Sequence, residues 1–124
     1  MKNLKEIISE KLILNKTVKH TQYYLVSGIH DSYNYLIDTL GEENEIIPEG
    51  NFFGVFIVSH KVLLTLDQDL LMDKTVSSVF KIPISYNINK FIKDYKHNLV
   101  DIKKFFINKK ELKKIFTKKN ETDK

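Results

Sequence analysis

The chain has 124 residues, of which 42% are hydrophobic and 29% are charged, and its formal net charge is +4. A chain of this length and composition is typical of one globular domain and not of a disordered segment. It contains neither cysteine nor arginine. This excludes disulfides, thiolate catalysis, thiolate metal sites, arginine fingers and bidentate guanidinium contacts.

Charge is distributed unevenly along the chain. Residues 88–124 hold 12 lysines and five acidic residues, whereas residues 1–87 hold eight lysines and 11 acidic residues. Such a separation is typical of a surface that binds phosphates or an acidic partner. The competing explanation is compositional, because AT-rich genomes favour lysine codons.

The first half of the chain predicts two helices with a strand between them. Apolar spacing indicates a helix over 3–13, and the aromatic, β-branched segment 22–27 predicts a strand that ends at Gly28. We expect Asp31 to be the N-cap of a helix over 32–40, which Gly41 ends.

The middle of the chain predicts mainly strands. Residues 42–50 are acidic and contain Pro48 and Gly50, which predicts a loop. The apolar runs 52–58 and 62–66 indicate two strands of a hairpin, placed centrally and covered on at least one face. The segment 75–84 contains Pro83 and predicts an edge strand, or a strand followed by extended chain.

The last third predicts two helices. Seven apolar residues of 88–107 fall on one face of a single helix and are expected to belong to the core. They are Ile88, Phe91, Ile92, Tyr95, Leu99, Ile102 and Phe106. Asn108 and Glu111 then form a capping-box pattern, with Ile107 and Leu112 as its hydrophobic staple, so a second helix is predicted over 109–118. Residues 119–124 are expected to fray.

Together these elements predict one α+β domain over residues 1–118. Its sheet is small and antiparallel, with about four strands packed by helices in the order α-β-α-β-β-β-α-α. Neither a signal-peptide pattern nor an apolar run of about 18–20 residues is present, so a cytoplasmic location is expected.

The short C-terminal helix is the leading candidate for function. An apolar ridge on it is formed by Leu112, Ile115 and Phe116, and lysines flank this ridge. These lysines are Lys109, Lys110, Lys113, Lys114, Lys118 and Lys119. The leading interpretation is a non-enzymatic accessory protein that uses the ridge to bind another protein or a second copy of itself. Alternatively, the same lysines bind nucleic acid through backbone contacts, or they merely keep the helix soluble.

Sequence motifs for catalysis are mostly missing. The chain has no Gly-rich phosphate loop and no nucleophile elbow of the Gly-x-Ser-x-Gly type, and its four histidines are scattered. Asp67, Asp69 and the pair His30–Asp31 leave a metal-dependent hydrolase or nuclease as a second alternative. Because a turn and a helix cap explain these residues more simply, we expect no enzyme activity, metal or cofactor.

Aromatic residues offer a last alternative, a base-stacking platform on the sheet. The residues concerned are Tyr23, Tyr24, Tyr33, Tyr35, Phe52, Phe53, Phe56 and Phe80. Packing in the core is the favoured interpretation for them.

Overall fold

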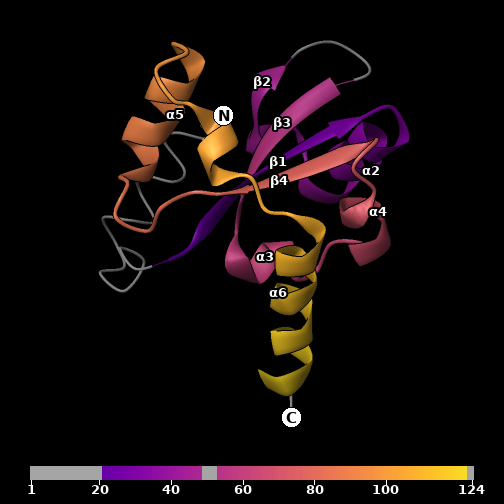
Figure 1. Cartoon of the computed structure of the whole chain (residues 1–124). Helices are drawn as coiled ribbons and strands as arrows, with labels where there is room; N and C mark the ends of the chain where they lie inside the picture. Colours follow the sequence, from indigo (N-terminus) through magenta and orange to yellow (C-terminus); the bar gives the residue numbers. More distant parts are fainter. Residues whose placement is uncertain (1–20, 49–52, 123–124) are drawn as a thin grey trace.

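A computed structural model describes residues 21–48 and 53–122 of the chain (Figure 1). The α-helices are α2 (Asp31–Leu40), α3 (His60–Leu63), α4 (Gln68–Met72), α5 (Ile88–Lys96) and α6 (Lys109–Thr122). The strands are β1 (Tyr23–Ile29), β2 (Glu45–Pro48), β3 (Phe53–Ser59) and β4 (Ser77–Lys81), and two short 3-10 helices are η2 (Glu42–Asn44) and η3 (Ile102–Phe105). The helix predicted over 3–13 lies outside the described residues.

The four strands form one antiparallel sheet in the order β2-β3-β1-β4. This confirms the predicted α+β class. Strand β4 lies at an edge, as expected for the segment containing it, and it is shorter than the predicted 75–84. Among the described helices none is long and apolar enough to cross a bilayer.

Both faces of the sheet are covered. Tyr24 and Val26 of β1 pack with residues of α2, α3, α4 and α6, whereas the intervening Leu25 packs with α5. Strand β3 is buried on both faces in the same way. Its near-continuous apolar sequence is therefore the pattern of a central strand, as predicted.

Helix α2 packs very closely on the sheet, and a glycine makes this possible. A Cβ atom at Gly28 would lie 2.7 Å from both the Leu36 Cδ1 and the Ser32 Oγ atoms. The buried Ser32 hydroxyl is hydrogen-bonded to the Ser77 hydroxyl at 2.6 Å, which links α2 to β4. Gly28 thus sets the distance between the helix layer and the sheet.

The ends of α2 differ in how well they were predicted. The helix ends at Gly41, which has a φ of 82° and donates its N–H to the Ile37 carbonyl at 2.9 Å, as expected. The predicted N-cap is wrong, because Asp31 is the first helical residue and His30 occupies the cap position without a side-chain cap.

Two predictions for the middle of the chain are wrong. The acidic segment 42–50 is not all loop, because β2 pairs with β3 and forms the other edge of the sheet. The run 62–66 is not a strand: Ser59 accepts a hydrogen bond from the Val62 N–H at 3.3 Å and thereby caps α3. Leu63 and Leu66 then turn into the core. A five-residue apolar run does not distinguish a buried strand from a buried helical turn.

The single helix predicted over 88–107 is also wrong. Asn87 caps α5 by accepting the Lys90 N–H at 3.0 Å, and the helix stops at Lys96. Asn98 then adopts a φ of 59°, and the Leu99 N–H bonds back to the Asp94 carbonyl at 2.8 Å. This left-handed ending is a common helix stop, because asparagine tolerates that conformation. Leu99, which is predicted to lie on the apolar face of that helix, is 73% exposed.

Candidate functional site

Helix α6 begins where the capping pattern places it. The Glu111 N–H donates to the Asn108 Oδ1 at 2.8 Å, and both Ile107 and Leu112 are buried in one core cluster, as a hydrophobic staple requires. The helix continues to Thr122, past the predicted end at residue 118. Figure 1 shows its C-terminal part running away from the sheet.

The predicted apolar ridge does not form an exposed surface. Leu112 and Phe116 are only 2% and 5% exposed and belong to the core between α6, α4 and the sheet, with Ile115 packed partly against them. These are the apolar residues with helical spacing on α6, so the hydrophobic effect directs that stripe inward. The prediction that these three side chains form a partner-binding ridge is corrected accordingly.

The lysines of the same helix remain at the surface. Lys109, Lys110, Lys113 and Lys114 are all exposed, and the side chains of Lys118 and Lys119 lie outside the description. Two further exposed lysines precede the helix on η3. We call the six described residues Lys103, Lys104, Lys109, Lys110, Lys113 and Lys114 the lysine surface.

Few acidic groups neutralise the lysine surface. A salt bridge forms between Lys90 and Asp94 at 2.7 Å on α5, and none is found on the lysine surface among the residues whose side chains the structure describes. Glu111 is the acidic residue in the first turn of α6. Hydrogen bonds from Thr75 lower the pKa of the Asp73 carboxyl, and the positive charge of Lys109 lowers it slightly further. Most of the positive charge therefore faces solvent.

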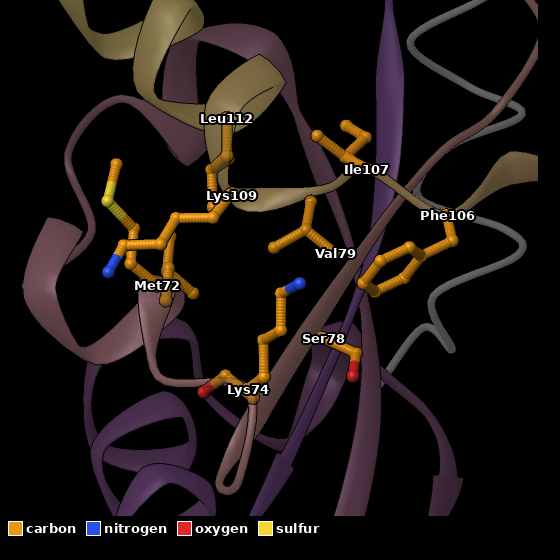
Figure 2. Close-up of a pocket in the computed structure, with 10 residues that line it drawn as sticks. Met72, Lys74, Ser78, Val79, Phe106, Ile107, Lys109 and Leu112 are labelled. Atoms are coloured by element: carbon orange, nitrogen blue, oxygen red, sulfur yellow. The ribbon is translucent and has the colours of Figure 1, made fainter.

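A small notch lies between α4, β4 and the start of α6. Its volume is about 10 Å³, which is room for about one water molecule. Figure 2 shows the Lys74 side chain reaching across this notch toward Phe106, whereas the Lys109 side chain runs along the opposite side with its ammonium group next to Met72. The Lys74 Nζ lies 5.9 Å from the centre of the Phe106 ring, a cation–π distance. The notch itself is far smaller than an ordinary ligand pocket.

Phe106 is the residue that sequence reasoning missed. The apolar spacing of residues 88–107 predicts that Phe106 lies on the buried face of one long helix, yet it is 40% exposed. The chain leaves η3 in an extended form, and Phe106 forms a β-bridge with Phe80 beside the outer edge of β4. The sequence carries no signal for this difference, because Phe106 and Ile107 are both apolar and only the structure exposes one and buries the other.

The buried Tyr24 forms the most notable polar contact inside the molecule. Its hydroxyl lies 3.0 Å from the Nδ1 of His60, and burial raises its pKa, with a smaller contribution from the Glu111 carboxylate. The contact joins β1 to α3. His60 is exposed, but the Tyr24 ring is buried in the core. The contact between them therefore stabilises the fold and leaves the Tyr24 ring inaccessible to a ligand.

The residues considered for metal chemistry have structural roles. Asp67 caps α4 by accepting the Leu70 N–H at 3.1 Å, and Asp69 is an exposed residue of that helix. His30 lies in the sharp β1–α2 turn with a φ of 59° and a ψ of −120°. Among the described residues, no group of three or more His, Asp or Glu side chains could hold a metal ion.

The aromatic platform considered on the sheet is mostly core. Tyr24 and Phe56 are buried, and Tyr33, Tyr35, Phe53 and Phe80 pack against the two core clusters.

Comparison with protein-family models, curated proteins and solved structures gives no match to this chain. Any functional proposal therefore depends on the lysine surface and the notch beside it.

Proposed function

We propose that this protein is a non-enzymatic binding protein whose lysine surface contacts the phosphate backbone of nucleic acid. The observation that supports the proposal is the division of α6 into two sides. Leu112 and Phe116 are buried, while Lys109, Lys110, Lys113 and Lys114 are exposed. What α6 offers to a partner is thus positive charge with little apolar area.

This division favours phosphate over a protein partner. Protein interfaces depend on aromatic, methionine and arginine anchors, and lysine is depleted in them. The chain contains no arginine, and the anchors proposed on α6 are in the core. Phosphate binding needs only ammonium groups that displace condensed counterions, which lysine supplies.

The proposed contact is independent of base sequence. Base reading in the major groove relies mainly on bidentate arginine, asparagine or glutamine side chains. Ammonium groups act as point charges and cannot form such paired contacts. If all six lysines contact duplex phosphates, the affinity falls about a thousandfold for a fourfold rise in salt.

Fluorescence anisotropy with a labelled oligonucleotide at about 50 mM salt tests the proposal. The triple variant Lys110→Glu, Lys113→Glu, Lys114→Glu is expected to bind at least about tenfold more weakly than wild type. Its matched control carries three equivalent reversals on exposed lysines of other helices, at Lys61, Lys93 and Lys96.

Two results contradict the proposal. One is the absence of measurable binding by the wild-type protein at low salt. The other is an equal loss in the control variant, since that outcome reports net charge and not the lysine surface. Competition with polyglutamate identifies the remaining possibility: if this acidic polypeptide displaces the oligonucleotide at equal charge, the partner is an acidic protein and not nucleic acid.

A further inference from the structure

Phe106 is an anchored aromatic ring with substantial exposure. The Ile107 N–H donates to the Val79 carbonyl at 2.9 Å, which fixes the chain against the edge of β4. The ring meets the Phe80 ring edge-on, with centroids 5.8 Å apart and an interplanar angle of 65°. It is nonetheless 40% exposed, so Phe106 remains partly open to solvent although Phe80 and Lys74 contact its ring.

Positive charge lies beside this ring. The Lys74 Nζ lies over it at 5.9 Å, and Lys109 lines the same notch with its ammonium group on the far side, next to Met72 (Figure 2). Lys103 and Lys104 precede it by three and two residues on η3 and are both exposed. The Asp73 carboxylate also faces Lys109, but hydrogen bonds from Thr75 hold it in place.

We propose that Phe106 is a base-stacking site and that the protein binds single-stranded nucleic acid in preference to duplex, with Lys74 and Lys109 contacting the phosphates beside the stacked base. This inference rests on the proposed function. A flat ring beside ammonium groups matches the way in which single strands are bound without sequence preference. In a duplex the bases are already stacked on each other, so the ring has no free base face to contact.

The dimensions of the notch agree with a surface contact. About 10 Å³ holds no base or nucleoside, so a ligand must lie across the rim and not inside. The Lys74 ammonium group can then contact either the ring or a phosphate. Without ligand its ammonium group lies against the ring, and with a base on the ring it can turn toward the neighbouring phosphate.

The test compares oligo(dT) of about 15 nucleotides with a duplex of equal phosphate number, both at low salt. Phe106→Leu keeps apolar bulk against Phe80 and removes the π face. We expect it to weaken oligo(dT) binding by at least about fivefold and to leave duplex binding within about twofold. Phe106→Tyr should bind like wild type. Leu99→Ala, a change at a more exposed apolar residue, is the control and should change neither affinity.

The outcomes separate this inference from the proposed function. Unchanged oligo(dT) affinity in Phe106→Leu overturns the stacking site while nucleic-acid binding stands. Failure of the wild-type protein to bind either ligand overturns both. Should Phe106→Leu unfold, photocross-linking of an oligonucleotide carrying 5-iodouracil decides: the cross-link must map to Phe106, and one confined to other residues contradicts the proposal.

Discussion

Replacing Leu112 by alanine tests whether α6 is part of the core. The side chain is 2% exposed and packs with Ile107 and Phe116 in the cluster on the face of the sheet that α2, α3, α4 and α6 cover. If α6 were a detached binding element, the same replacement would leave the stability of the domain almost unchanged. The change in the free energy of unfolding therefore distinguishes a docked helix from a free one.

The expected loss in the free energy of unfolding follows from the burial of Leu112. Leu→Ala removes three carbon atoms, and the lost transfer free energy is about 2.4 kcal/mol at about 0.8 kcal/mol per methylene. A cavity adds to this, but Leu112 already lines the open notch, so water can enter and the added amount is small. We expect a loss of about 3 kcal/mol. For a chain of this length that corresponds to a Tm lower by about 10 °C.

The assay is urea unfolding followed by circular dichroism at pH 7, with Lys113→Ala as the matched control on the next residue. Lys113 is exposed, so its replacement should change stability by less than about 0.5 kcal/mol. A loss of less than about 1 kcal/mol for Leu112→Ala, similar to that of the control, would refute the docking of α6. It would also restore the apolar ridge as a candidate protein-binding surface.

Replacements at three other residues test the local arguments. Gly28→Ala should destabilise the domain by about 1–3 kcal/mol in urea unfolding, because its Cβ would lie 2.7 Å from the Leu36 Cδ1 atom. Asn108→Ala should cost about 1 kcal/mol and Asn108→Asp much less, since only the latter keeps an acceptor for the first turn of α6. Burial raises the pKa of Glu45 above 4.5, so its ionisation opposes folding. Glu45→Gln should therefore raise Tm at pH 7, and this gain should shrink as the pH falls through the raised pKa toward 4.5 and below.

Sequence reasoning succeeded where a local chemical signal is decisive. Gly41 ends α2 because its φ of 82° suits glycine, and Asn108 caps α6 because its side chain accepts a backbone N–H. The central position of β3 was readable because a strand covered on both faces has no polar alternation. At Gly41 and Asn108 the deciding interaction lies within a few residues along the chain, and in β3 the apolar composition itself carries the signal.

It failed where the deciding interaction is distant or the pattern continues across a break. Strand β2 exists because β3 pairs with it, and its own four residues carry little strand signal. The apolar spacing of α5 continues past Lys96 by coincidence, although Asn98 has already ended the helix. Phe106 is exposed only because the helix has ended before it. Its place in the candidate site could therefore not be found from apolar periodicity.

Lysine and phenylalanine together limit what this surface can recognise. An ammonium group senses the charge of a phosphate, and an aromatic ring senses the face that every base presents, so neither distinguishes one base from another. Discrimination must then come from strand geometry, because only an unpaired base can reach the Phe106 ring. The affinity for single strands should accordingly rise with length until the lysine surface is filled, and permuting the sequence at constant length should change it little. A marked preference for one sequence over its permutations would show that groups other than Phe106 and these lysines read the ligand.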